Sequence, residues 1–247
     1  PGRPPQRWTS LGPVQPGGRS RPFFYVAPFL ITSLSFANLA RSLGRDQPFY
    51  VLQPQGMDTD DPVHDTVEAM ATHYVRELRS VQATGPYLIG GHCAGASVAF
   101  ELARQLQADG ERISLLALVD AEPPHVSRPA VHPLTYVRRR IGHYRRDRRL
   151  LAAIRWYLHV VTERIVRRRF GTAATRRLAD LRSRHAGAHE AYAAGPFDGD
   201  VLLIRSAEWN GDPANVWQLR WSDLISGRLD IEEVAGTHAG LVQMESS

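Results

Sequence analysis

One cysteine stands in a setting typical of a catalytic nucleophile. Gly91-His92-Cys93-Ala94-Gly95 follows the apolar run Tyr87-Leu88-Ile89 and precedes a helical pattern from Ala96 to Leu106. The pattern G-x-S-x-G between a strand and a helix is a nucleophile elbow, and here cysteine takes the central position. The pattern predicts that Cys93 is a nucleophile. The alternative is an inert cysteine buried on a core helix.

The two glycines have a steric reason. Side chains two residues before and after a nucleophile on such a sharp turn would collide with the neighbouring strand and helix, and Gly91 and Gly95 remove them. The turn would lift the sulfur of Cys93 above the sheet edge. It would also place that sulfur at a helix N-terminus, where the helix dipole favours a thiolate.

A thiol nucleophile needs a base, and the base needs an orienting acid. Asp120 ends an apolar strand that follows the elbow helix, and His238 lies in a Gly-rich turn after the last expected strand. In α/β-hydrolases the nucleophile comes first, the acid second and the histidine last. We therefore expect Cys93, Asp120 and His238 to meet at one edge of the sheet as a triad.

Alternatives remain for the acid and the base. Asp120 could simply end its strand, and Asp198, Asp200 and Glu208 flank the next strand and are competitors for the acid. Most of the ten histidines are expected at the surface. His92 is adjacent to the cysteine but should point away from it, into the structure.

An oxyanion requires two backbone N–H donors. Ala94, the residue after the nucleophile, is expected to supply one at the start of the helix. The second is expected from the loop after the first strand, where Phe29 is the first choice and Leu30 the second. Alternatively, Phe29 only packs in the core.

The elements that must position these residues alternate along the chain. Short apolar runs predict strands at Phe23–Ala27, Phe49–Leu52, Tyr87–Ile89, Ile113–Val119 and Val201–Ile204, and a last strand is expected at Leu229–Val234. Helical spacing predicts helices at Ser33–Leu43, Thr66–Val81, Ala96–Leu106 and Pro213–Leu224. Strands separated by helices predict an α/β fold with a mainly parallel sheet flanked by helices.

A basic section interrupts this alternation. Residues 128–184 hold 17 arginines and three acidic residues, whereas the whole chain has a net charge of +5 and no lysine. The section has no convincing strand, and Leu134–Tyr144, Leu150–Arg169 and Thr175–Tyr192 favour helices. We expect a helical lid over about residues 129–194, at the edge where ligands bind.

Two interpretations of the basic helices stay open. They are either an arginine-rich surface or a docking face for an acidic partner. Trp156 and Tyr157 either line an acyl channel or pack between helices. No aromatic interleaving or known motif supports nucleic-acid binding.

Length and composition favour one domain. The 247 residues suit a single α/β domain with an insertion, and one cysteine allows no intramolecular disulfide. Residues 1–21 are rich in proline, glycine and arginine and predict a linker, which leaves residues 22–247 for the domain. No apolar run is long enough for a membrane span, and we expect a cytoplasmic protein.

The motifs resemble those of the chain-releasing thioesterase domains of nonribosomal peptide and polyketide synthases, which are α/β-hydrolases. The matching pieces are Phe23–Pro28, Gln53–Gly56, Gly85–His92, Leu116–Asp120 and Gly236–His238. The resemblance places the family's nucleophile on Cys93, its acid on Asp120, its base on His238, and its oxyanion donors on Phe29 and Ala94. The chain departs from the family in having cysteine instead of serine, Gly95-Ala96 instead of two glycines, and no glycine around Ile31 and Thr32.

This resemblance implies a reaction. A carrier protein would present an acyl chain on phosphopantetheine, with no metal or other bound cofactor, and Cys93 would take over the acyl group. A cysteine acyl-enzyme is itself a thioester and keeps its activation, so release by cyclisation is expected. The alternatives are a hydrolytic or editing thioesterase and, from another class, a non-catalytic module that docks a carrier protein.

Overall fold

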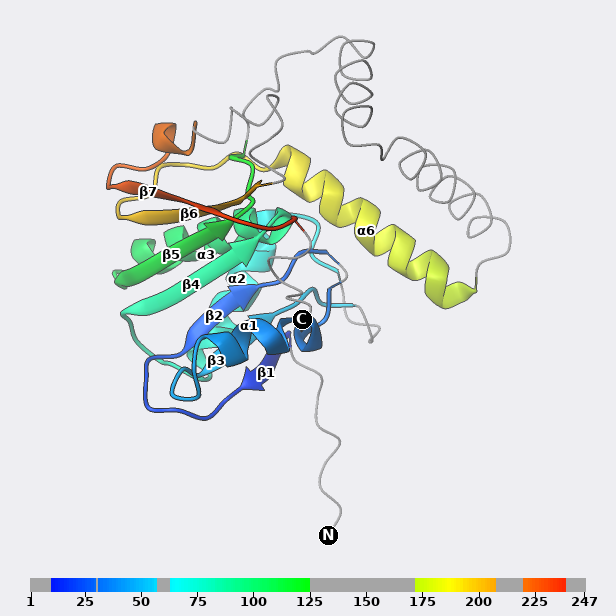
Figure 1. The fold of residues 1–247 in the computed structure, drawn as a ribbon. Helices are drawn as coiled ribbons and strands as arrows, with labels where there is room; N and C mark the ends of the chain where they lie inside the picture. The colour runs from blue at the N-terminus through cyan, green and yellow to red at the C-terminus, as the bar shows by residue number, and fades with distance from the viewer. Residues whose placement is uncertain (1–9, 30, 57–62, 125–171, 208–219, 239–247) are drawn as a thin grey trace, which may run out of the picture. The chain divides into compact units, whose positions relative to one another are not determined.

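Strands and helices alternate around one sheet in the computed structural model (Figure 1). The structure describes residues 10–29, 31–56, 63–124, 172–207 and 220–238. Within them, seven strands pair in the order β1-β3-β2-β4-β5-β6-β7. These strands are β1 (Leu11–Gln15), β2 (Phe23–Val26), β3 (Phe49–Leu52), β4 (Tyr87–His92), β5 (Ile113–Val119), β6 (Val201–Ser206) and β7 (Leu229–Val234). All pairings are parallel except that of β1 with β3.

The six strands expected from the sequence are all present. The bounds of β3, β5 and β7 agree with the expected ranges, whereas β4 and β6 run further toward the site, to His92 and Ser206. The mainly parallel sheet confirms the predicted α/β class. Because all the strands from β2 to β7 run parallel to one another, their carboxyl ends meet at one edge of the sheet.

Strand β1 is an element that composition did not indicate. It lies inside residues 1–21, the stretch whose proline, glycine and arginine content predicts a linker. Leu11 is buried and joins the core, and the backbone oxygen of Ser10 accepts a hydrogen bond from the nitrogen of Gln53 at 2.9 Å. A short edge strand tolerates glycine and proline because one of its sides needs no partner, so composition alone does not reveal it.

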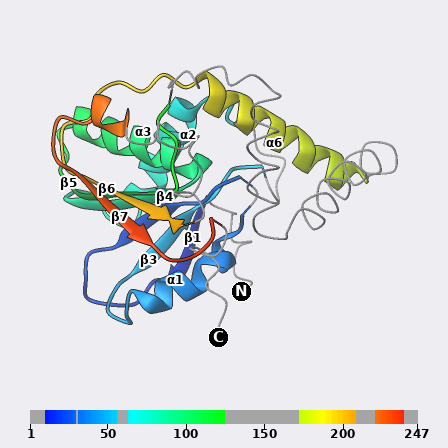
Figure 2. The same ribbon diagram turned by 45° about the horizontal axis from the view of Figure 1, so that its top comes forward.

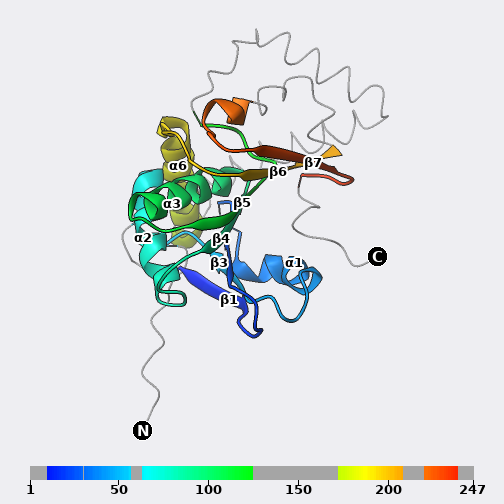
Figure 3. The same ribbon diagram turned by 90° about the vertical axis from the view of Figure 1, so that its left-hand side faces the viewer.

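The helices cover both faces of the sheet. Helices α2 (Val67–Arg79) and α3 (Ala94–Ala108) lie on one face, and α1 (Ala37–Ser42) lies on the other, as Figures 2 and 3 show. The range expected as one helix at Ser33–Leu43 divides into a 3-10 turn, η1 (Ser33–Phe36), and α1. The core accordingly has two clusters, a larger one under α2 and α3 and a smaller one around Phe36 and Phe49.

Helix α2 begins where the sequence allows a cap. The hydroxyl of Thr66 accepts a hydrogen bond from the nitrogen of Ala69 at 3.1 Å, which satisfies one of the free donors of the first turn. Its apolar positions recur at helical spacing and are buried: Val67, Met70, Ala71, Tyr74, Val75 and Leu78. Helix α3 packs against both α2 and the strands β4 and β5, so most of its residues are buried.

The chain divides into two compact units. One comprises residues 1–126 and 181–247, and the other comprises residues 127–180. Helix α6 (Ala173–Ala191) agrees with the helix expected over Thr175–Tyr192 and runs from the second unit into the first. Three expectations fall outside the described residues: the helices Leu134–Tyr144 and Leu150–Arg169, most of Pro213–Leu224, and the environment of Trp156 and Tyr157.

The described helices give one further result. None of them combines sufficient length with sufficient apolar character to span a bilayer.

Candidate active site

The elbow has the backbone geometry expected for a nucleophile. Cys93 lies between the last residue of β4 and the first residue of α3, with φ 54° and ψ −128°. Among the described non-glycine residues, only Cys93 and Asp120 have positive φ. Such a conformation costs free energy and is maintained because the surrounding strand and helix fix it.

The steric prediction for the two glycines is confirmed. A Cβ on Gly91 would lie 2.7 Å from the backbone oxygen of Gly95, and a Cβ on Gly95 would lie 2.6 Å from the backbone oxygen of Val26. The contact with Val26 also shows that the end of β2 reaches the start of α3. The loop after β2 is therefore next to the elbow.

The sulfur-bearing residue is accessible. Cys93 is partly exposed, in contrast to the buried residues on either side of it. Its backbone nitrogen donates a hydrogen bond to the oxygen of Val119 at 2.9 Å, which ties the elbow to the end of β5. Asp120 follows Val119 directly, so this bond also holds the acid close to the cysteine.

His238 and Asp120 form the expected pair. The Nδ1 atom of His238 lies 3.1 Å from Oδ2 of Asp120, although 118 residues separate them in sequence. The Asp120 side chain is fully buried, whereas that of His238 is 28% exposed. The carboxylate thus holds one ring nitrogen, and the other ring nitrogen can serve a second partner.

The electrostatics connect all three residues. Burial by itself would lower the pKa of His238, but hydrogen bonds to Asp120 and Cys93, together with the charges of both groups, raise the pKa to about 9. Burial would raise the pKa of Asp120, but hydrogen bonds to His238 and Ser206 lower it below its usual value. His238 therefore interacts with both Asp120 and Cys93, and a proton could pass between sulfur and imidazole.

Asp120 is held from several directions. It follows β5 with φ 42°, and its nitrogen donates to the backbone oxygen of Ile204 at 2.9 Å. Its Oδ1 atom accepts a hydrogen bond from the backbone nitrogen of Ser206 at 2.7 Å. This leaves Oδ2 directed at His238. The sequence analysis did not identify Ser206, because a backbone donor at the end of β6 has no signature in side-chain types.

The described competitors for the acid lie elsewhere. Asp198 Oδ1 accepts from the hydroxyl of Ser226 at 2.7 Å, and Asp200 Oδ1 accepts from the nitrogen of Arg228 at 2.8 Å. Both carboxylates are used at the amino ends of β6 and β7, the opposite edge of the sheet. Glu208, the third competitor, is outside the described residues.

His92 has an unusual environment. It is buried, as expected, with an exposed fraction of 5%, but its ring lies beside the pair formed by His238 and Asp120. Its ring lies 4.6 Å from that of His238, with the planes 39° apart. A hydrogen bond with the backbone of His238 contributes to its electrostatics. Burial and the nearby His238 lower the pKa of His92 to about 4, against the opposing effect of Asp120.

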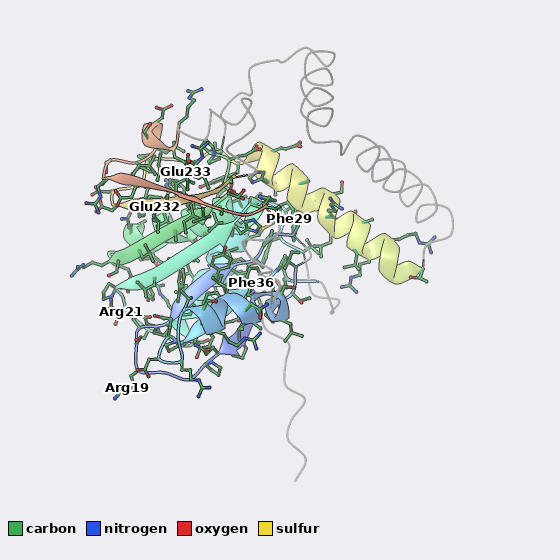
Figure 4. All side chains as sticks on the ribbon, in the orientation of Figure 1. Arg19, Arg21, Phe29, Phe36, Glu232 and Glu233 are labelled. Carbon is green, nitrogen blue, oxygen red and sulfur yellow. The ribbon has the colours of Figure 1, made fainter. Side chains whose placement is uncertain are left out.

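The residues expected around an oxyanion lie beside the elbow. Ala94 is the first residue of α3, where backbone N–H groups are free of helical partners. Phe29 lies beyond the carboxyl end of β2, and Figure 4 shows it at the sheet edge opposite to Arg21. Its ring packs 5.3 Å from the ring of His185 on α6, a contact that the sequence did not indicate. Leu30 is outside the described residues.

A buried glutamine holds the same loop. Gln53 follows β3 and is 8% exposed, and its Oε1 atom accepts a hydrogen bond from the backbone nitrogen of Ser33 at 3.0 Å. This bond fixes the far end of the loop that contains Phe29. In the sequence, Gln53 was noted only as the first residue of Gln53–Gly56, one of the segments that resemble the thioesterase family.

The strand order, the elbow and the histidine after β7 define the α/β-hydrolase class. Residues 21–247 match the thioesterase domain family, and the chain belongs to that family. The expected fold is therefore confirmed, and the family places the chain among enzymes that act on thioesters.

Relatives by sequence are larger proteins. The chain is 34% identical over 122 residues to "Atromentin synthetase greA" of Suillus grevillei, covering 49% of this chain and 13% of the relative. It is 37% identical over 115 residues to "Dimodular nonribosomal peptide synthase" of Bacillus subtilis, covering 47% of this chain and 5% of the relative. The matched segment is thus a small part of each relative.

Solved structures show the same fold. The NocB thioesterase domain from the nocardicin cluster has a TM-score of 0.66 at 22% identity, over 94% of this chain and 91% of that chain. RedJ, the thioesterase from the prodiginine biosynthetic pathway in Streptomyces coelicolor, has a TM-score of 0.64 at 22% identity, over 96% and 90% of the two chains.

Proposed function

We propose that this chain releases an acyl or peptidyl group from a carrier protein through a thioester with Cys93. The observation that carries the proposal is that Cys93, Asp120 and His238 converge from the ends of three different strands. The fold positions these residues at one sheet edge, and the family acts on thioesters.

The first half of the reaction would load the enzyme. The sulfur of Cys93 attacks the carbonyl carbon of the incoming thioester, and His238 takes the thiol proton while Asp120 orients the ring. The backbone N–H groups of Ala94 and Phe29 would receive the developing negative charge on oxygen. When the tetrahedral intermediate collapses, the bond to the phosphopantetheine sulfur breaks and His238 returns the proton to that sulfur.

The second half would release the product. A water molecule, amine or hydroxyl gives its proton to His238 and attacks the acyl carbon. The carbon–sulfur bond to Cys93 then breaks, and His238 returns the proton to the Cys93 sulfur. A serine enzyme would form an oxoester, which is less activated than the substrate thioester. A cysteine enzyme exchanges one thioester for another, so the intermediate keeps its activation for a weak or strained internal nucleophile. We therefore infer release by cyclisation.

The carrier protein follows from the same proposal. The relatives are named as a synthetase and as a dimodular nonribosomal peptide synthase. The matched segment covers 13% of the length of the first and 5% of the length of the second. A thioesterase segment within such a protein would receive its substrate from a carrier domain of the same assembly. The arginine-rich residues 128–184 would offer positive charge to an acidic carrier.

The test is to follow the acyl group. Wild-type protein and Cys93→Ala are mixed with acyl-pantetheine substrates that carry an internal amine or hydroxyl, and intact-protein mass spectrometry detects the acyl-enzyme. We expect acyl transfer to the wild type and none to Cys93→Ala, with cyclic product from the wild type. Cys93→Ser is expected to form an oxoester and to shift the products toward the linear acid.

Two results would contradict the proposal. Acylation that persists in Cys93→Ala would remove Cys93 as the nucleophile. Turnover of every substrate to linear acid only would leave a hydrolytic thioesterase and refute cyclisation. Asp198→Asn is the matched control, because Asp198 lies at the opposite edge of the sheet.

A further inference from the structure

A buried histidine of α6 lies against the loop that is proposed to supply an oxyanion donor. Four residues at the end of α6 recur at helical spacing and are each at most 5% exposed: Leu181, His185, Ala188 and Tyr192. They form the side of the helix that packs on the body of the fold. His185 is the member of this set that reaches Phe29, and no step of the proposed reaction uses it.

Contacts on both sides of His185 hold the helix in place. The hydroxyl of Tyr192 donates a buried hydrogen bond to Oε2 of Glu101 on α3 at 2.7 Å. Arg184, the residue before His185, forms an ion pair with Asp65 at 3.3 Å, which joins α6 to the segment that leads into α2. The ion pair is exposed and contributes little stability by itself. Together the two contacts nevertheless give His185 a defined position.

The contact between His185 and Phe29 is a packing contact between two rings. The ring centroids are 5.3 Å apart and the planes are inclined by 41°, a typical geometry for an aromatic pair. Burial and the nearby His64 lower the pKa of His185 to about 4, against the opposing effect of Asp65, so the ring is uncharged at neutral pH. Its Nδ1 atom is buried without a hydrogen-bond partner among the described residues. The ring face therefore makes the contact, and Nδ1 plays no part in it.

The loop that contains Phe29 is anchored near its ends. Strand β2 holds the beginning, and the hydrogen bond from the nitrogen of Ser33 to Oε1 of Gln53 holds the far side at 3.0 Å. The direction of the Phe29 N–H depends on rotation about the bonds on either side of the Pro28–Phe29 peptide. Such a rotation moves the N–H relative to the ring of Phe29. A ring that is held in place therefore limits the directions that the N–H can take.

We propose that His185 is a positioning residue for the oxyanion donor Phe29, a role that rests on the proposed function. Its ring would hold that of Phe29, so that the Phe29 N–H points toward the carbonyl oxygen of the thioester when Cys93 attacks. His185 itself would touch neither the substrate nor the acyl group. Its loss would leave nucleophile, base and acid in place and would slow the steps in which an oxyanion forms.

Two reactions of the same sulfur separate this role from general damage to the site. Acyl transfer to Cys93 passes through an oxyanion, whereas alkylation of Cys93 by iodoacetamide displaces iodide from a saturated carbon and forms none. Both rates are measured for the wild type and His185→Ala. We expect kcat for an acyl-pantetheine substrate to fall by about 10- to 100-fold in His185→Ala, with KM and the alkylation rate within about 3-fold of wild type.

Matched variants test the ring contact itself. His185→Phe keeps a flat ring without the nitrogens and is expected to retain kcat within about 3-fold of wild type. Phe29→Ala removes the other ring and keeps the backbone N–H, so its loss of kcat should equal that of His185→Ala. The double variant should lose no more than about 3-fold beyond either single variant, because both remove the same contact. Ser183→Ala, on the exposed side of α6, is the control and should change neither rate.

Amide hydrogen exchange supplies a measurement that needs no turnover. The Phe29 N–H should exchange at least about 10-fold faster in His185→Ala than in wild type, and at the wild-type rate in His185→Phe. Unchanged exchange or unchanged kcat in His185→Ala would overturn the proposal. A parallel loss of alkylation, or a His185→Phe variant as slow as His185→Ala, would do the same. If the wild type transferred no acyl group but showed this exchange pattern, the proposed function would fail and the hold of His185 on the Phe29 backbone would stand.

Discussion

Asp120→Asn is the substitution that tests the site most directly. Asparagine has the same shape as aspartate, and its oxygen can still accept the hydrogen bond from Ser206 that the structure shows at 2.7 Å. Its NH2 group would then take the place of Oδ2 of Asp120, which lies 3.1 Å from Nδ1 of His238. Two donors cannot share that contact, so the ring would move its proton to Nε2, toward Cys93.

The magnitude follows from what Asp120 does to His238. Its hydrogen bond and charge help to raise the pKa of His238 to about 9 although burial lowers it. Without the carboxylate, less opposes the effect of burial, so the pKa of His238 should fall. Each pKa unit corresponds to about 1.4 kcal/mol of lost interaction with the protonated ring. The wrong tautomer of a triad histidine costs about 10⁴-fold in turnover in the serine-protease example. We expect a loss of about 10³- to 10⁴-fold in kcat here.

The assay combines rate and titration. Turnover of an acyl-pantetheine substrate is measured for the wild type, Asp120→Asn and the control Asp198→Asn, and the pKa of His238 is followed by NMR. We expect Asp198→Asn to remain within about 3-fold of wild type, as is usual for a surface change away from the site. If Asp120→Asn kept more than a tenth of the wild-type rate, or left the His238 pKa near 9, the assignment of Asp120 as the orienting acid would be refuted.

Three further predictions concern the same edge of the sheet. Gly91→Ala should lower the free energy of unfolding by about 1–3 kcal/mol, because its Cβ would meet a backbone oxygen at 2.7 Å. Chemical denaturation tests this against Gly187→Ala, which should not destabilise the protein because a Cβ there meets nothing within 4 Å. The raised pKa of His238 means that its contribution to stability is fully present below pH 6.5 and is lost as the pH rises through about 9; thermal melts that were flat from pH 6.5 to 9.5 would contradict this. Gln53→Leu removes the acceptor for the Ser33 nitrogen at 3.0 Å and should reduce kcat by about 10-fold with a smaller change in KM, since the loop with the proposed oxyanion donor Phe29 would lose a support; an unchanged kcat would exclude this role.

Much of the fold could be predicted because its signals are local. Short apolar runs predicted most of the strands, and the bounds of β3, β5 and β7 agree with the expected ranges. The spacing of Gly91 and Gly95 around Cys93 predicted a turn whose crowding the structure confirms. Composition failed at β1, because a short antiparallel edge strand needs few apolar residues and tolerates the proline and glycine of a linker.

The sequence alone determined which residues were candidates, and the tertiary structure decided which of them meet. Residue types and chain order pointed to Cys93, Asp120 and His238, since parallel strands bring their carboxyl ends to one edge. No pattern could show that the Ser206 backbone fixes the acid, that Gln53 holds the neighbouring loop, or that the ring of His92 packs against that of His238. These contacts join segments far apart in sequence, and their distances exist only once the sheet has formed.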